Sequence, residues 1–541
     1  MGNSGERNAD DLVPPDAPDE VKVQALKKPR APEFDATLGK KGPPAGKGEP
    51  RHRLVVIGDS LTHGFQSGAV FNTDLSYGAI IAYELGCLDQ FRYPRYPGPG
   101  GLPLNIELLL RDLEGALGSN ISAWDLPVAL FRARQFMDTV EDYWERGAGR
   151  DAPVISAYNQ ALAVYGWDLR DALSRTAASC ESAVKEPKDD LLSQVIENNT
   201  ERAALRVYPH WNAQTKNMTL FEAAAELGRD KDAGADAGIE TLVVFLGANN
   251  ALQSVIDLRV AWSQDAGYAN LDKKGAYTVW TPMHFRAELD EVVKAVKAIN
   301  ARHVIWCTVP HVTIVPIARG VGVKIEAGSR YFPFYTRPWV SDTDFSASQD
   351  EHLTGKEARA VDCAIDLYNE AIQQVVEQAR SAVGDDQRDW FLLDIAGLLD
   401  RLASRRYITD PSARPDWWTP YPLPAPIKAL VPVPDSLFLT GDGQGGRATG
   451  GLFSLDGVHP TTVGYGLIAQ EMINIMRLAG VEFRNENGQL RSDPVGVDFD
   501  RLILRDTLIR RPPQNLKEGL DILGWADQTL DWVRRTLTFT I

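Results

Sequence analysis

A serine that follows a short apolar run near the start of the chain is the first residue whose position points to chemistry. The β-branched, apolar run from Leu54 to Ile57 predicts a buried strand that stops at Gly58. Ser60 lies on the turn that follows, where its hydroxyl is presented rather than packed. If a helix begins just after Ser60, its first N–H groups and positive dipole end can stabilise a developing oxyanion. A strand, a turn and a polar helix cap would explain the same residues without any chemistry.

An acid and a base with suitable spacing occur much later in the chain. A serine hydroxyl is a weak nucleophile, so it needs a base within hydrogen-bond reach and a group that orients that base. Asp456 and His459 are three residues apart across a turn at Gly457. The carboxylate can accept from the near imidazole nitrogen while the other nitrogen faces Ser60. The alternative is that His459 is only a polar residue at a helix N-terminus.

Two further blocks stand where other strands should end. They are Ala163-Val164-Tyr165-Gly166 and Gly247-Ala248-Asn249-Asn250. With these blocks the chain resembles the SGNH (GDSL-type) hydrolase family of esterases and lipases. The family's four named residues, Ser, Gly, Asn and His, occur here in that order as Ser60, Gly166, Asn249 and His459. The resemblance spans about residues 53 to 478, with long segments between the blocks that carry no match. One position departs, because Asn250 stands where the family usually has aspartate.

The resemblance implies a role for each of these residues. Ser60, Asp456 and His459 would form the catalytic triad, and Asp59 would support the nucleophile turn. The oxyanion hole would consist of the backbone N–H groups of Ser60 and Gly166 and the side-chain amide of Asn249. Taken singly, the last two would be a turn glycine and a helix-capping asparagine.

The implied activity is that of a serine esterase or lipase, which cleaves carboxylic esters through an acyl-enzyme intermediate. Two alternatives use the same site, a carbohydrate acetylesterase and an acyltransferase. A catalytically silent binding protein on the same fold is a less favoured reading.

The elements that must position these residues follow an alternating pattern. Apolar runs predict strands near 54–57, 153–158, 240–246, 303–309 and 390–395, and helices near 77–85, 284–299 and 356–382. Continuous apolar strands alternating with helices predict an α/β fold, with a parallel sheet between two helix layers. We expect a flavodoxin-like five-stranded sheet in the order 2-1-3-4-5. Ligands of such sheets bind at the carboxyl ends of the strands, which would bring Ser60, Gly166 and Asn249 to one edge.

The rest of the chain divides into a tail, insertions and an extension. Residues 1–50 are rich in Pro, Gly and charged residues and predict a disordered tail. The hydrolase domain would span 51–482, with insertions at about 88–150, 254–283, 312–355 and 402–452. Residues 483–541 predict a helical extension, in which Asn515 and Glu518 would cap a final helix.

The insertions are rich in aromatic residues. These side chains can form a lid for an apolar or sugar-bearing substrate, or they can anchor the insertions to the core, which we favour for most of them. The residues are Trp262, Trp280, Tyr331, Phe332, Phe334, Tyr335, Trp339, Trp417, Trp418 and Tyr421. His63 and His311 can line the pocket, but we favour ordinary polar loop positions for both.

Composition narrows the classes of partner. A net charge of -16 and a pI near 5.1 argue against nucleic acid or an anionic membrane as the main partner. A small-molecule or lipid-like ester is the expected ligand, and nothing in the sequence indicates an oligomeric state. The sequence lacks a signal peptide pattern and an apolar run of about 20 residues, so we expect a cytoplasmic protein without a transmembrane segment.

No cofactor or metal is expected. The four cysteines are far apart and lack zinc spacing, and no cluster of His, Asp and Glu lies near the motifs. The segment Gly441–Gly446 fits the pattern Gly-x-Gly-x-x-Gly formally. It is predicted neither to follow a strand nor to open a helix, so it does not indicate a dinucleotide site.

Overall fold

Five parallel strands form the centre of the protein. The structure is a computed structural model that describes residues 8–43, 46–119, 121, 124–185, 196–264, 267–381, 388–485, 487–492 and 494–516. The strand order is β5-β1-β6-β7-β11, which is the predicted order 2-1-3-4-5, so the predicted fold class is confirmed. Val56 of β1 lies between Ala161 of β5 and Val243 of β6. The strands are β1 (His52–Gly58), β5 (Ala161–Ala163), β6 (Ile239–Phe245), β7 (Ala301–Cys307) and β11 (Asp389–Leu393).

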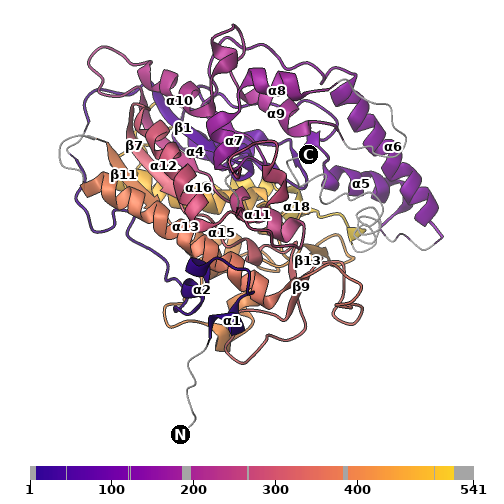
Figure 1. Ribbon diagram of the computed structural model, residues 1–541. Coiled ribbons are helices and arrows are strands. Elements are labelled where there is room, and N and C mark those ends of the chain that lie inside the picture. Colours follow the sequence, from indigo (N-terminus) through magenta and orange to yellow (C-terminus); the bar gives the residue numbers. More distant parts are fainter. Residues whose placement is uncertain are drawn as a thin grey trace.

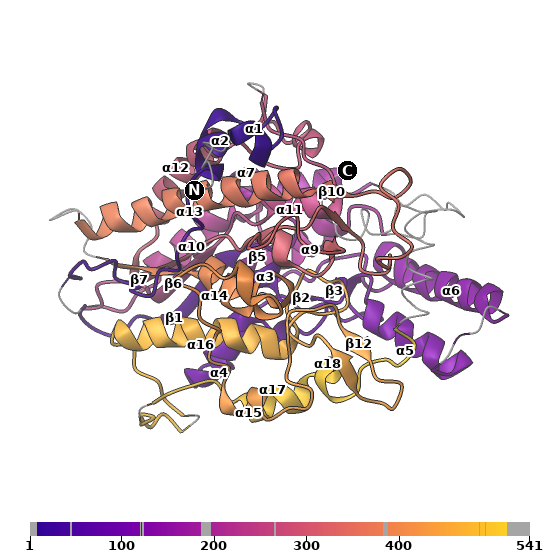
Figure 2. The same ribbon diagram turned by 90° about the horizontal axis from the view of Figure 1, so that it is seen from below.

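Helices cover both faces of this sheet (Figures 1 and 2). On one face lie α10 (Leu220–Arg229), α12 (Pro282–Lys297) and α13 (Gly355–Ser381), and on the other lie α4 (Tyr77–Glu84) and α16 (Thr462–Leu478). Coverage on both sides explains why all seven residues of β6 are buried, and why the strand reads as a continuous apolar run.

Most element bounds agree with the sequence, and one strand does not. The strands β1, β6, β7 and β11 and the helices α4, α12 and α13 lie within two residues of their predicted bounds. The prediction of a strand at 153–158 is wrong, because the second strand is Ala161–Ala163. Val154 is 70% exposed and takes no part in the sheet. The apolar run at 153–158 therefore did not locate the second strand, because the position of that strand is set by its pairing with β1.

The N-terminal strap, residues 8–43, is packed, so the prediction of a disordered tail is wrong for the residues described. It forms α1 (Ala9–Leu12) and α2 (Asp19–Ala25), and α2 packs against α13. Val13 and Val21 are fully buried. Further along, Arg30 binds the carboxylate of Asp394 with its Nη1 at 2.9 Å. A few well-placed apolar residues and one buried ion pair thus hold a segment whose average composition is polar.

Arg30→Ala should destabilise the protein by about 3 kcal/mol, because breaking a buried ion pair leaves an unpaired buried charge. The two side chains are only 11% and 4% exposed. Lys28→Ala is the matched control, since the pair that Lys28 makes with Asp416 is fully exposed and contributes little. Urea unfolding of both variants measures the difference. If Arg30→Ala unfolded like Lys28→Ala, the strap would not be docked as described.

The predicted insertions contain helices and short strands of their own. The first holds β4 (Leu102–Pro103) and the long helices α5 (Ile106–Leu117) and α6 (Leu126–Glu145), which project from the body (Figure 2). The third and fourth hold β8 (Arg319–Val321), β9 (Phe334–Thr336), β10 (Leu353–Thr354), α15 (Ala425–Lys428), β12 (Thr440–Gly441) and β13 (Arg447–Thr449). The glycine-rich segment 441–446 therefore belongs to the hairpin β12–β13.

Most aromatic residues of the insertions are anchors. Trp262, Trp280, Tyr331, Phe332, Tyr335 and Trp418 are each at most 9% exposed and belong to the core clusters. Trp339, Trp417 and Tyr421 pack against these clusters while half-buried. The favoured interpretation, that these residues attach the insertions to the core, is confirmed for them.

The remaining α-helices, apart from a short one directly after β1, lie in the connections between the strands or follow β13. They are α7 (Leu169–Ser174), α8 (Ala177–Ala183), α9 (Asn199–Val207), α11 (Asn249–Ile256), α14 (Ile395–Leu402), α17 (Phe499–Arg505) and α18 (Thr507–Arg510). Of the C-terminal extension, α17 packs on α16. The final helix is predicted to begin after Asn515. Only its first residue, Leu516, is among the described residues, and the rest of the predicted helix lies outside them. In the part of the chain that the structure describes, no helix is both long and apolar enough to cross a membrane.

Candidate active site

Ser60 stands at the junction between β1 and the short helix α3 (Ser60–His63). Asp59 caps this helix, and its Oδ1 accepts from the backbone N–H of Leu61 at 3.1 Å. The turn is so tight that a Cβ on Gly58 would lie 1.9 Å from Oγ1 of Thr62. The backbone N–H of Ser60 is one of the first in the helix, and such groups have no acceptor within the helix. Strand, glycine and cap therefore present both the hydroxyl and the N–H of Ser60 at the carboxyl end of β1.

The structure brings Ser60, His459 and Asp456 together. Nε2 of His459 lies 2.8 Å from Oγ of Ser60, and Nδ1 lies 3.1 Å from Oδ2 of Asp456. All three side chains are at most 3% exposed. These distances are those of a nucleophile, a base and the group that orients the base.

Backbone groups hold Asp456 in its charged form. Its Oδ1 accepts from the N–H groups of Val458 and His459, each at 2.8 Å, and its Oδ2 also accepts from Gly68 at 3.0 Å. Burial alone would raise the pKa of Asp456, but His459 and the backbone N–H groups hold that pKa below its ordinary value. An ionised Asp456 keeps the proton of His459 on Nδ1, which leaves Nε2 free to take a proton from Ser60.

The hairpin formed by β2 (Phe65–Gln66) and β3 (Ala69–Val70) supports this triad and was not anticipated. Its turn supplies the Gly68 N–H to Asp456, and the ring of Phe65 lies 4.6 Å from that of His459. Gly68 has a φ of +82°, and a Cβ there would lie 2.5 Å from the carbonyl oxygen of Leu104. The Ser67-Gly68 dipeptide is a turn signal that would have located the hairpin, although not its partner.

The two other predicted blocks lie at the same edge of the sheet. Gly166, with a φ of +78°, stands in the turn after β5. Asn249 is the first residue of α11, after β6, and its Nδ2 donates to the carbonyl of Trp167 at 2.9 Å. This bond ties the asparagine block to the glycine block. Asn250 is fully buried, and its Oδ1 accepts from Leu169 at 3.4 Å, so it serves the same junction. The oxyanion roles of Ser60, Gly166 and Asn249 stay predictions.

His63 and His311 are both buried, and neither lines the cavity beside the triad. The prediction of a polar loop position is wrong for His63, the last residue of α3, whereas His311 does lie in an irregular segment after β7. Nδ1 of His63 accepts from the N–H of Tyr165 at 3.2 Å, and burial lowers the pKa of His63 to about 3. His311 lies between Asp400 and Asp366, with contacts of 3.1 Å on both ring nitrogens. Burial would lower the pKa of His311, but the surrounding carboxylates raise it to about 10. The first histidine is therefore neutral and the second charged.

An apolar cavity of about 100 Å³ adjoins the triad. Ser60 and His459 contribute to its wall, and aliphatic side chains of η4 (Val312–Ile314), α14 and α16 form much of the rest. The residues include Leu252, Val312, Val315, Ile395, Leu398, Leu399, Leu402, Leu452, Phe453, Val458, Leu467 and Ile468. The N-terminal strap contributes indirectly, because Asp394, the partner of Arg30, caps α14 through the N–H of Gly397 at 3.2 Å.

Asp59 is the second buried carboxyl group near the base. Burial raises the pKa of Asp59 to about 7, against the opposing effects of the Leu61 N–H and of His459. Its Oδ2 has no hydrogen-bond partner among the residues that the structure describes. The carboxyl group therefore changes charge near neutral pH, although within the described chain no hydrogen bond joins its side chain to Ser60 or His459.

Asp59→Asn should change how stability depends on pH. A raised pKa means that the folded state is favoured while the group is protonated, and that this advantage is lost as pH rises from about 4 through 7. The wild type should therefore lose about 4 kcal/mol relative to Asp59→Asn between pH 4 and 8. The amide oxygen can still cap α3. Urea unfolding of both proteins across this range is the measurement, and parallel stability curves would show that Asp59 does not titrate near 7.

In the described ranges, no group of three or more His, Cys, Asp or Glu residues is placed to hold a metal ion. Comparison with protein-family models, with curated proteins and with solved structures found no match for this chain.

Proposed function

We propose that this protein is a serine hydrolase that cleaves carboxylic esters through an acyl-enzyme intermediate. The observation that carries the proposal is the hydrogen-bonded series from Ser60 Oγ to His459 Nε2 and from His459 Nδ1 to Asp456. Ser60 attacks the ester carbonyl while His459 takes its proton and then gives it to the departing alcohol. Water, deprotonated by His459, attacks the acyl-enzyme, and the acid leaves as Ser60 recovers its proton.

The negative oxygen of the tetrahedral intermediate needs donors that are already in place. The N–H of Ser60 at the start of α3 is one candidate, and the Gly166 N–H and the Asn249 amide are the others. Their common position at the carboxyl ends of β1, β5 and β6 supports this assignment. The amide of Asn249 has two hydrogens, of which one is needed for Trp167.

The cavity beside the triad favours an aliphatic acyl group. A water molecule takes about 30 Å³ of liquid, so the cavity has room for about three groups of that size. With the carbonyl carbon held at Ser60 and three further groups in the cavity, an acyl chain of about four carbons would fill it. An acetyl group would leave much of this apolar surface uncovered, so the cavity supports an esterase of aliphatic esters over an acetylesterase. An acyltransferase would use the same acyl site, and an added alcohol acceptor distinguishes it from a hydrolase.

We expect kcat/KM for p-nitrophenyl esters to rise from acetate to an optimum near butyrate. Each buried methylene contributes about 0.8 kcal/mol, which is roughly fourfold in kcat/KM per carbon until the cavity is full. Initial rates with esters of two to twelve carbons measure this. A protein active on acetylated sugars and inactive on the longer aryl esters would favour the acetylesterase reading.

Filling the cavity should reverse the preference. Leu402→Trp enlarges a half-buried wall residue and should reduce turnover of butyrate much more than that of acetate. Leu504→Trp, at a position that is 64% exposed, is the control for the same exchange. An equal loss for both esters in Leu402→Trp would mean that the acyl chain binds elsewhere.

A further inference from the structure

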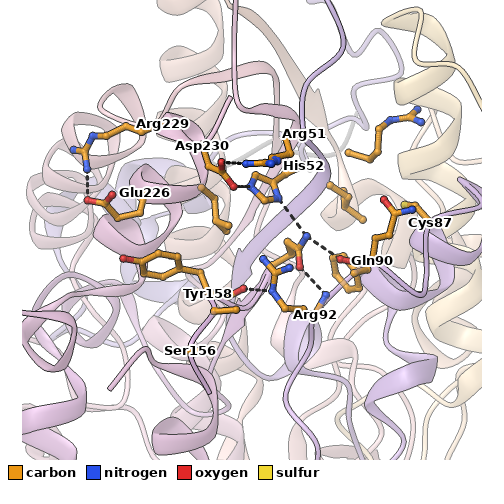
Figure 3. A pocket seen from close by; sticks show the side chains of 16 residues that line it. Arg51, His52, Cys87, Gln90, Arg92, Ser156, Tyr158, Glu226, Arg229 and Asp230 are labelled. Atoms are coloured by element: carbon orange, nitrogen blue, oxygen red, sulfur yellow. Dashed lines mark hydrogen bonds and ion pairs between the residues drawn. The ribbon is translucent and has the colours of Figure 1, made fainter. Parts of the chain in front are cut away.

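A second, larger cavity lies at the amino ends of the sheet strands, opposite the end that carries the triad. It measures about 710 Å³ and surrounds His52, the first residue of β1 (Figure 3). Ser60 follows the other end of this seven-residue strand, about 20 Å away at the usual rise per residue. The wall comes from the segments 51–54, 87–92, 156–160 and 226–230. Its size is within the range of small-molecule sites, and none of the predicted catalytic residues takes part.

The floor of this cavity is a fixed polar network. Gln160 donates through Nε2 to Nδ1 of His52 at 3.4 Å and to the carbonyl of Gln90 at 3.1 Å. Its Oε1 accepts from the N–H of Arg92 at 2.6 Å. Because Nδ1 of His52 accepts, the imidazole proton is on Nε2, which donates to Asp230 at 3.1 Å. His52 and Gln160 are each 5% exposed, and burial lowers the pKa of His52, so the imidazole on this floor is neutral.

Arg92 is the one arginine of the wall without a carboxylate partner among the described residues. Its Nε donates to the carbonyl of Tyr158 at 2.6 Å, which fixes the plane of the guanidinium (Figure 3). Neither terminal nitrogen has a hydrogen-bond or ion-pair partner within the described chain. The other wall arginines form the pairs Arg51–Asp230, Arg229–Glu226 and Arg53–Glu240. A half-buried arginine that makes no ion pair within the described residues is unusual in a protein of net charge -16.

We propose that this cavity binds a small organic carboxylate, with both oxygens held by the terminal nitrogens of Arg92. The planar fork of an arginine matches a carboxylate in a bidentate manner. Phe91, Leu54 and Tyr158 offer an apolar wall for the body of the ligand. A single negative charge fits better than the double charge of a phosphate ester, because the other wall arginines are already paired with carboxylates and Arg92 offers one positive charge. The proposal does not depend on the proposed function.

Titration calorimetry with sodium benzoate tests this site in the full-length protein. We expect benzoate to bind and Arg92→Gln to weaken its affinity by roughly 10- to 100-fold, as for the loss of hydrogen bonds to a charged group. Arg92→Lys, which keeps the charge without the fork, should fall in between. Arg95→Gln removes an exposed arginine three residues away and should bind benzoate like the wild type.

Inorganic phosphate is the second probe, and it should bind more weakly than benzoate at pH 7.5. Ester hydrolysis by Arg92→Gln should equal that of the wild type, which separates this site from the triad. If Arg92→Gln were unstable, Arg92→Lys would still give the comparison. The proposal is overturned if benzoate does not bind at millimolar concentration, if both Arg92 variants bind it like the wild type, or if phosphate binds more tightly.

Discussion

Replacing Ser60 with alanine is expected to lower kcat for ester hydrolysis on the order of 10⁶-fold, the effect of losing the nucleophile in a serine protease. Ser60 contributes one oxygen, and that oxygen lies 2.8 Å from the only base of the proposed triad. No other hydroxyl is hydrogen-bonded to His459 among the described residues. The substitution removes one atom from a capped turn, so the circular dichroism spectrum should not change.

Ser254→Ala is the matched control for this experiment. Ser254 is also fully buried, but its hydroxyl donates to the carbonyl of Ala251 within α11. The control should therefore keep wild-type turnover with p-nitrophenyl butyrate. A Ser60→Ala protein that is folded and turns over within tenfold of wild type would show that another group is the nucleophile.

Asp456→Asn should lower kcat by about 10⁴-fold, the reference value for this exchange in a serine protease triad. The geometry explains why an isosteric amide fails. The two backbone N–H groups of Val458 and His459 require an oxygen at the Oδ1 position. The amide nitrogen, itself a donor, then faces Nδ1 of His459 and the N–H of Gly68, which both donate to Asp456 in the wild type. His459 can relieve this clash only by moving its proton to Nε2, where it can no longer accept from Ser60.

The control for this exchange is Asp435→Asn. Asp435 also binds two backbone N–H groups, those of Leu437 and Gly450, but through Oδ1 alone. An amide reproduces that pattern, so activity should be retained.

In Asp456→Asn itself KM should change little, because Asp456 does not line the apolar cavity beside the triad. If kcat stayed within a few-fold of wild type, Asp456 would not be the residue that orients His459.

The parts of the fold that sequence predicts well are those fixed by local pattern. Strands β1, β6, β7 and β11 each contain an unbroken apolar run, because both faces of the sheet are covered. The strand β5 has only three residues, Ala161–Ala163, and the longer run nearby, residues 153–158, lies outside the sheet with Val154 exposed. Its identity depends on pairing with β1, which lies about 100 residues away in sequence. Local periodicity carries no information about that partner.

The same distinction applies to the site. The family resemblance, together with the three-residue spacing of Asp456 and His459, predicts that these two residues meet Ser60. The meeting of Ser60, Gly166 and Asn249 was expected because strand ends collect at one edge of a parallel sheet. The Gly68 N–H that holds Asp456 could not be predicted, since it comes from a hairpin 388 residues away in sequence. The N-terminal strap was misjudged for a similar reason. Average composition describes its polar majority, whereas its docking depends on Val13, Val21 and the pairing of Arg30 with Asp394.

The central claim is that Ser60 is a nucleophile activated by His459. Intact-mass spectrometry after incubation with a fluorophosphonate tests it directly, because such a reagent forms a stable bond with an activated serine and needs no knowledge of the natural ester. We expect one adduct per chain in the wild type, located on the peptide that carries Ser60, and one adduct per chain in Ser254→Ala. Ser60→Ala should give none, and Asp456→Asn should react far more slowly than the wild type. An unlabelled wild-type protein, or equal labelling of Ser60→Ala, would contradict the account.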